Sequence, residues 1–148
     1  MMLYLDTSAL VKRYLIERGT ADVETLVQQA DGVGTSLLTR AEVSATLAKA
    51  VRMNLLKRLE ADQLRQQFYI HWPALNVIQI TETVVALADA LAWEHGLRGY
   101  DAVHLATAVT WQEALGEPVQ VATFDKQLWQ AAQTVGLAAW PEKMNDER

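Results

Sequence analysis

The N-terminal segment Met2-Leu3-Tyr4-Leu5 places four apolar residues in a row and is followed at once by Asp6. A short continuous apolar run of this kind is typical of a central strand that is buried on both faces of a parallel sheet. The run from Ala9 to Ile16 has the pattern of a helix, so Asp6 lies at the carboxyl end of the predicted strand. In open α/β sheets this end lines the ligand crevice, which makes Asp6 a site candidate. The alternative is an Asp-Thr-Ser turn that caps the following helix.

The rest of the chain alternates predicted helices with predicted strands. Strands are expected at 33–36, 75–80, 119–123 and 138–140, and helices at 21–30, 37–53, 59–72, 83–94, 100–115 and 126–135. Strands that alternate with helices in this way predict a mostly parallel sheet that is covered on both faces. We therefore expect an α/β fold, a three-layer α/β/α sandwich, in which residues 1–148 form one domain.

The composition narrows the location of the protein and the chemistry open to it. No apolar run is long enough to span a membrane, and the N-terminus lacks the pattern of a signal peptide, so we expect a cytoplasmic protein with no membrane partner. The chain has no cysteine, which excludes disulfides, thiolate metal sites and cysteine nucleophiles. Any metal must therefore be held by oxygen or imidazole ligands, and oxygen ligands favour hard cations.

Two further acids occupy positions that resemble the position of Asp6. Asp101 opens a predicted helix that is apolar almost all round. Burying an unpaired carboxylate there costs on the order of several kcal/mol, so we expect Asp101 to be paired, hydrogen-bonded by the helix N-terminus or bound to a cation. Asp125 follows the predicted strand that ends at Thr123 and precedes a helix. Taken alone, Asp125 is explained as an ordinary N-cap.

Glu42 is a fourth candidate, and it also has a structural alternative. The sequence Thr39-Arg40-Ala41-Glu42 spells a capping box, in which the glutamate returns to the Thr39 backbone amide. If the helix instead begins earlier and is capped by Ser36, Glu42 lies near the same crevice as the other acids. Four independent caps on one edge of the sheet are a less economical account than one cation site, so we favour the site.

The net charge of −5 argues mildly against a nucleic-acid partner, but the charges are unevenly distributed. No acid lies between Glu42 and Glu60, whereas that stretch contains the basic residues Lys49, Arg52, Lys57 and Arg58. Such a stripe can hold phosphates on a protein whose total charge is negative, although a solvated helix surface explains it as well. We take Lys49 and Arg52 as candidate RNA-binding residues.

Four blocks of the sequence resemble the PIN-domain ribonucleases. These are Leu5-Asp6-Thr7-Ser8-Ala9-Leu10, Arg40-Ala41-Glu42, the block from Leu97 to Ala108 that contains Asp101, and Thr123-Phe124-Asp125-Lys126-Gln127-Leu128. The block around Asp101 is the most specific of them. The order and spacing of the blocks are most similar to the VapC-like toxins of bacterial and archaeal type II toxin–antitoxin systems, and the resemblance covers essentially the whole chain.

The resemblance implies an endoribonuclease that depends on Mg²⁺ or Mn²⁺. In the family pattern Asp6 and Asp101 are the principal metal ligands, Glu42 and Asp125 complete the acidic cluster, and Ser8 or Thr123 orients a ligand or water. A divalent cation would remove the repulsion among the four carboxylates and keep them ionised. Hydrolysis would use an activated water rather than the RNA 2′-hydroxyl, so the products would carry a 5′-phosphate and a 3′-hydroxyl.

Other side chains near the acids are assigned supporting roles. His104 lies one turn after Asp101 and could hydrogen-bond it, and we favour such support over direct ligation of a metal. For Arg98 we favour a salt bridge over a phosphate contact. His71 and His95 are expected to be structural, and Trp93, Trp111 and Trp129 to serve core or dimer packing.

The resemblance also implies partners. A nuclease of this kind is held inactive by an antitoxin, and we expect a homodimer. The segments 9–16 and 55–72 carry more apolar residues than two peripheral helices need, which predicts a groove for a partner helix. The residues are Leu10, Tyr14, Leu55, Leu56, Leu64, Phe68 and Tyr69. A PIN-fold RNA-processing or quality-control nuclease remains an alternative function, and a non-catalytic RNA-binding or interaction domain is disfavoured because every acid is present.

Overall fold

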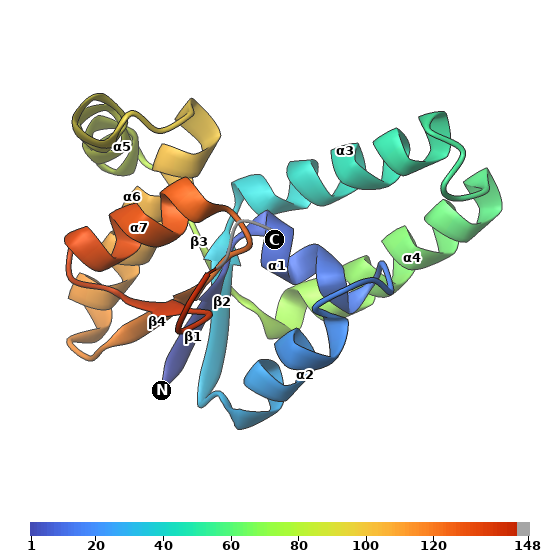
Figure 1. Ribbon diagram of the computed structural model, residues 1–148, viewed down its shortest axis with the longest axis horizontal. Coiled ribbons are helices and arrows are strands. Elements are labelled where there is room, and N and C mark those ends of the chain that lie inside the picture. The colour runs from blue at the N-terminus through green and yellow to red at the C-terminus, as the bar shows by residue number, and fades with distance from the viewer. Residues whose placement is uncertain (145–148) are drawn as a thin grey trace.

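A parallel sheet forms the centre of the computed structural model, which describes residues 1–144 (Figure 1). Within the described residues the sheet has five strands in the order β3-β2-β1-β4-β5, and every neighbouring pair is parallel. The strands are β1 (Met2–Leu5), β2 (Gly32–Ser36), β3 (Asn76–Ile78), β4 (Val119–Ala122) and β5 (Ala138–Trp140). Strand β1 is central and buried on both faces, as its apolar run predicts.

Helices cover both faces of the sheet and complete the predicted three-layer sandwich (Figure 1). One face packs against α5 (Glu82–His95), α6 (Gly99–Leu115) and α7 (Lys126–Thr134). The other packs against α1 (Thr7–Leu10), α2 (Thr20–Gln29), α3 (Leu38–Arg52) and α4 (Arg58–His71). The 3₁₀ turns η1 (Val11–Arg13) and η2 (Trp72–Ala74) extend α1 and α4.

The period-two alternation of β1 divides the core into two clusters. Leu3 and Leu5 point into the cluster formed with α1, α3 and α4, whereas Tyr4 points into the cluster formed with α5, α6 and α7. Close packing on the face covered by α5, α6 and α7 requires a glycine in β2, because a Cβ on Gly34 would lie 2.7 Å from the ring of Trp111. Trp111 is thus a core residue, as predicted.

The predicted helix at 9–16 is wrong in its extent. Helix α1 ends at Leu10, η1 ends at Arg13, and the chain then turns into α2. Thr20 stabilises this turn, because its hydroxyl accepts a hydrogen bond from the Glu17 amide and donates one to the Leu15 carbonyl. These side-chain bonds satisfy backbone groups that a longer helix would have paired internally.

One prediction about apolar side chains is also wrong. Leu10, Tyr14 and Phe68 are expected in a surface groove, but all three are buried in the cluster between the sheet, α1, α3 and α4. Trp93, for which core or dimer packing is expected, is 92% exposed on α5, which excludes the core and leaves dimer packing. No helix within residues 1–144 is both long and apolar enough to cross a bilayer.

Candidate active site

Parallel strands β1, β2 and β4 direct their carboxyl ends to one edge of the sheet, and the predicted acids gather there. A cleft of about 230 Å³ opens at this edge, and we call it the acid cleft. It is lined by Asp6, Thr7, Ser8, Glu42, Arg98, Tyr100, Asp101, His104, Phe124 and Asp125. The structure therefore brings together all four predicted acids, Ser8 and His104, and Thr123 lies directly behind them.

Asp6 is 3% exposed and receives three hydrogen bonds from neutral donors. The hydroxyl of Ser8 and the amide of Ala9 donate to Oδ1 over 2.7 and 2.9 Å, and the hydroxyl of Thr123 donates to Oδ2 over 2.6 Å. Asp6 does cap α1, so the cap and the site candidate are the same carboxylate. Burial raises the pKa of Asp6, and His104, Thr123 and Ser8 only partly offset that effect.

Ser8 and Thr123 also fix the loop that follows β4. The Ser8 hydroxyl accepts a hydrogen bond from the Phe124 amide, and the Thr123 hydroxyl accepts one from the Asp125 amide, each over 3.0 Å. Both side chains thus tie Asp6 to the segment that carries Asp125. The group that both hydroxyls orient in the structure is the Asp6 carboxylate.

Asp101 and Asp125 are held instead by the positively charged side chain of Arg98. Arg98 donates from Nε to Asp101 Oδ2 and from a terminal nitrogen to Asp125 Oδ2, both over 2.9 Å. Burial raises the pKa of Asp101, the neighbouring charges of Asp125 and Asp6 raise it further, and Arg98 opposes the rise. Asp125 also caps α7 by accepting from the Leu128 amide. The favoured interpretation of Arg98 as a salt-bridge residue agrees with these contacts.

Glu42 is held by a buried network that reaches through the core. Its Oε1 accepts from the Thr7 hydroxyl over 2.7 Å and lies 2.6 Å from His104 Nε2. The other ring nitrogen, Nδ1, lies 2.7 Å from the hydroxyl of Tyr4. Burial, with Asp6 and Glu42 nearby, raises the pKa of Tyr4 well above its ordinary value, so this phenol stays protonated. Because an ionised carboxylate only accepts hydrogen bonds, Nε2 of His104 donates to Glu42.

This network settles the two alternatives for Glu42. Burial alone would raise the pKa of Glu42, but the hydrogen bonds from His104 and Thr7 lower it below its ordinary value. Glu42 does not close a capping box, because Thr39 is buried and its hydroxyl pairs with Thr35 over 2.7 Å. Helix α3 begins at Leu38, whose amide donates to Ser36, which is the earlier start that places Glu42 in the crevice.

Sequence reasoning missed Tyr4 and Thr7 and gave His104 a different partner. His104 hydrogen-bonds Glu42 and Tyr4, whereas the proposed bond to Asp101 is replaced by that of Arg98. A signal for Tyr4 was present, because a phenol in an otherwise aliphatic buried strand needs a polar partner. Nothing in the local sequence identified that partner as a residue 100 positions away.

The donor set suits a hard divalent cation, since the acid cleft offers carboxylate and hydroxyl oxygens. Burial raises the pKa of both Asp6 and Asp101, and the charges of Asp125 and Asp6 raise that of Asp101 further, so a bound cation would favour the ionised form of both groups. As the side chains stand in residues 1–144, however, no three Asp, Glu or His groups are arranged to enclose a metal ion. The neutralising charge next to Asp101 and Asp125 is the Arg98 guanidinium.

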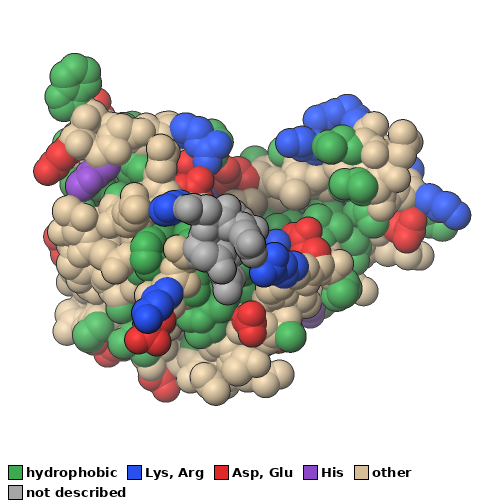
Figure 2. All heavy atoms as spheres, viewed as in Figure 1, with side chains coloured by type: hydrophobic (Ala, Val, Ile, Leu, Met, Phe, Trp, Pro, Cys, Tyr) green, Lys and Arg blue, Asp and Glu red, His purple; other side chains and the backbone are tan. Residues whose placement is uncertain are grey.

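A second hollow of about 550 Å³ joins the acid cleft, and we call it the basic groove. It shares Thr7, Ser8 and Glu42 with the cleft and extends along α3 past Lys49 and Arg52. Lys12 lies on its other side, with Nζ 4.6 Å from the ring centre of Phe124. Figure 2 shows charged side chains of both signs where the α5–α7 half of the molecule meets the arm formed by α3 and α4.

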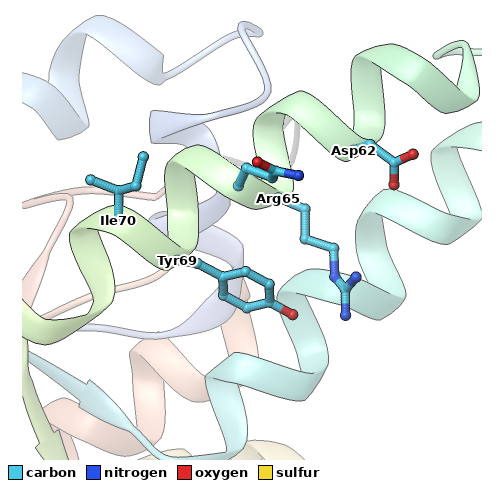
Figure 3. A pocket seen from close by; sticks show the side chains of 5 residues that line it. Asp62, Arg65, Tyr69 and Ile70 are labelled. Atoms are coloured by element: carbon cyan, nitrogen blue, oxygen red, sulfur yellow. The ribbon is translucent and has the colours of Figure 1, made fainter.

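A further hollow of about 340 Å³ lies on α4, away from the acids (Figure 3). It is lined by Asp62, Arg65, Gln66, Tyr69 and Ile70. Tyr69 and Arg65 extend from α4 towards α3 (Figure 3), and the Tyr69 ring lies about 5 Å from the guanidinium carbons of both Arg65 and Arg40. This hollow contains a single acid, so the acid cleft is the candidate active site.

The sequence profile of the PIN domain matches residues 3–133, which includes every residue of the acid cleft. This chain belongs to the PIN domain family. Ribonuclease VapC45 of Mycobacterium tuberculosis is 34% identical over 145 residues, covering 97% of this chain and 98% of its own. Ribonuclease VapC3 of Pyrobaculum aerophilum is also 34% identical, over 86% of this chain and 92% of its own.

Solved structures of low sequence identity share the PIN fold of this chain. FitAcB from Neisseria gonorrhoeae has a TM-score of 0.67 at 24% identity, covering 98% of this chain and 97% of the other. VapBC2 from Rickettsia felis, solved bound to a DNA fragment from its promoter, has a TM-score of 0.65 at 15% identity, covering 95% and 99%. These likenesses support the three-layer fold that the sequence predicted.

Proposed function

We propose that this PIN domain is a Mg²⁺- or Mn²⁺-dependent endoribonuclease and the toxin of a type II toxin–antitoxin pair. The observation that carries the proposal is the convergence of Asp6, Glu42, Asp101 and Asp125 on one cleft at the carboxyl edge of the sheet. The relatives named ribonuclease VapC support RNA as the substrate. Neighbouring structures titled as toxin–antitoxin complexes, including one from Klebsiella pneumoniae, support an antitoxin partner.

Asp6 and Asp101 would be the principal ligands of the metal, with Glu42 and Asp125 in support. When bound, such a cation activates water and stabilises negative charge on the phosphate. The chain itself fixes the ligand geometry, because Ser8, Ala9 and Thr123 leave the Asp6 carboxylate no freedom to rotate. Glu42 is kept ionised by His104 and Thr7, so it can take a proton from the attacking water. Water as nucleophile leaves a 5′-phosphate and a 3′-hydroxyl.

RNA would reach the acids through the basic groove. Lys49 and Arg52 line this groove, and no salt bridge to either residue occurs within the described part of the chain. Both charges are therefore open to phosphates.

Cleavage of a single-stranded RNA tests the nuclease proposal directly. The wild-type protein should cut with Mg²⁺ or Mn²⁺ and not in EDTA, and Asp6→Asn or Asp101→Asn should slow cutting by more than about a hundredfold while the circular dichroism spectrum is retained. Asp89→Asn is the matched control, because Asp89 is exposed on α5 and does not line the acid cleft. Undiminished cutting in EDTA would overturn the proposal.

The toxin role has its own test. Expression of the chain alone should arrest growth, and co-expression with a cognate antitoxin should restore growth and yield a stable complex. The apolar surface for an antitoxin differs from the predicted groove, because Leu55 and Ile70 are more than two-thirds exposed on the α3–α4 arm whereas Leu10, Tyr14 and Phe68 are buried. Harmless expression of a protein that cuts RNA would favour an RNA-processing nuclease.

We also propose a homodimer for the isolated chain. The exposed indole of Trp93 on α5 supports this, since tryptophan is enriched where protein surfaces are buried on association. Sedimentation of the wild type and Trp93→Ala measures the oligomeric state. A monomeric wild type would contradict the proposal.

A further inference from the structure

Arg98 is anchored at its backbone, whereas its side chain is largely exposed. Its carbonyl accepts the Ala102 amide over 2.9 Å at the start of α6, whereas the side chain is 57% exposed. The guanidinium carbon lies 4.8 Å from the ring centre of Tyr100, which gives the head group a flat surface at the mouth of the acid cleft. An exposed head on a fixed base can leave its partners without disturbing the fold.

The carboxylates that Arg98 bridges are also held by the chain around them. Asp101 is fixed by the first turn of α6 and is buried, and Asp125 is fixed by the hydrogen bond that its Oδ1 accepts from the Leu128 amide. Each carboxylate uses Oδ2 for Arg98. Removing the guanidinium would thus leave two oriented carboxylates with an uncompensated negative charge beside Asp6.

We propose that Arg98 is an internal counter-ion that occupies the metal-binding carboxylates of the metal-free protein and is displaced when a divalent cation binds. This rests on the proposed function, because it assigns Asp101 to the metal. It explains why the acids of this chain converge on one cleft while no three of the described acidic or imidazole groups enclose an ion. The guanidinium and the divalent cation neutralise the same charge, so they compete.

The displaced guanidinium has a second partner within reach. Arg98 and Tyr100 line the acid cleft, and Tyr100 also lines the basic groove along which RNA would lie. An arginine released at this point presents its planar fork to a phosphate, which it binds in the same two-pronged way as carboxylates. Metal binding would thus convert Arg98 from a salt-bridge residue into a phosphate-binding residue, which unites the two interpretations of its sequence position.

Direct measurement of Mn²⁺ binding without RNA tests the displacement. Titration calorimetry of the full chain should show Arg98→Gln binding Mn²⁺ on the order of tenfold more tightly than the wild type, because a competing unit charge has been removed. Arg58→Gln is the matched control, since Arg58 also pairs with an aspartate on its own helix, Asp62, and its affinity for Mn²⁺ should equal that of the wild type. Arg98→Lys, which keeps the charge, should bind less tightly than Arg98→Gln.

Thermal denaturation gives a second measurement that does not involve activity. A fixed excess of Mn²⁺ should raise the melting temperature of Arg98→Gln more than that of the wild type, in proportion to the tighter binding. Equal or weaker Mn²⁺ binding by Arg98→Gln, with binding by the wild type lost in Asp101→Asn, would overturn the counter-ion role and leave the proposed function standing. Absence of Mn²⁺ binding in every variant would overturn both.

Discussion

The two halves of the acid cleft hold their carboxylates by different means. Asp6 and Glu42 receive hydrogen bonds from hydroxyl, amide and imidazole groups that are mostly buried. Asp101 and Asp125 share an exposed guanidinium. Buried donors are held in place by the core, whereas the exposed Arg98 side chain cancels charge and can leave. The first half is therefore permanent, and the second half is exchangeable.

The sharpest way to break this comparison is to remove one supporting side chain from each half. His104→Ala removes the donor to Glu42 and opens a cavity in the core, so we expect a loss of about 3 kcal/mol in the free energy of unfolding. Arg98→Gln should cost about 1 kcal/mol or less, because its ion pairs are formed by an exposed side chain. Urea denaturation in EDTA measures both values.

A second substitution of His104 separates a hydrogen-bonding role from a packing role. His104→Gln keeps a side-chain N–H that can reach Glu42, so it should recover part of the RNA cleavage that His104→Ala loses. If both variants cleave equally while differing in stability, His104 contributes only packing. Equal destabilisation by His104→Ala and Arg98→Gln would remove the distinction between a permanent and an exchangeable half.

The pH dependence of stability sharpens the comparison for Asp6. Its pKa is raised in the folded protein above the ordinary value of about 4. At a pH between the ordinary and the raised pKa, the folded state therefore binds more protons than the unfolded state. This contribution to stability is present at low pH and is lost as the pH rises through the raised pKa. Asp6→Asn lacks the titration, so the melting temperature of the wild type in EDTA should fall relative to that of Asp6→Asn as the pH rises from 4 to 7.

A control within the same experiment comes from Glu42, whose pKa is lowered. Its contribution has the opposite sign, because it is present above the ordinary pKa of a glutamate and is lost as the pH falls through the lowered value. The melting temperature of the wild type relative to Glu42→Gln should therefore rise with pH in the acid range. Parallel curves for wild type and Asp6→Asn would show that burial does not perturb Asp6.

The sequence allowed the exchangeable half of the cleft to be anticipated better than the permanent half. Asp6, Asp101 and Asp125 follow strand ends or open helices, and parallel topology alone brings such positions to one edge. Arg98 and Asp101 are three residues apart on the same helical turn, so a salt bridge between them is a local inference. By contrast, the Tyr4–His104 bond joins residues 100 positions apart, and no local pattern reports such a pair.

The errors in the fold have related causes. Helical periodicity in 9–16 could not show that Thr20 would satisfy the backbone of a turn instead. The burial of Leu10 and Phe68 depends on how α1 packs beneath α3 and α4, which is a property of the assembled core. Each error concerns tertiary packing and not the order of the elements.

The smallest expected effect concerns the basic groove, which leads to the permanent half through Thr7 and Glu42. Replacing Lys49 and Arg52 together by glutamine should weaken binding of a single-stranded RNA and lower the slope of log affinity against log salt by about 1.4, which corresponds to two phosphate contacts. Lys57→Gln combined with Arg58→Gln removes the same net charge at the far end of the stripe, and its slope should equal that of the wild type.

Binding is measured by fluorescence anisotropy in EDTA, where no cleavage is expected. None of the four replaced side chains lines the acid cleft, so the affinity for Mn²⁺ should be unchanged in both double variants. An unchanged slope for the first double variant would return Lys49 and Arg52 to the role of solvated surface residues and leave Lys12 as the cation that lines the groove.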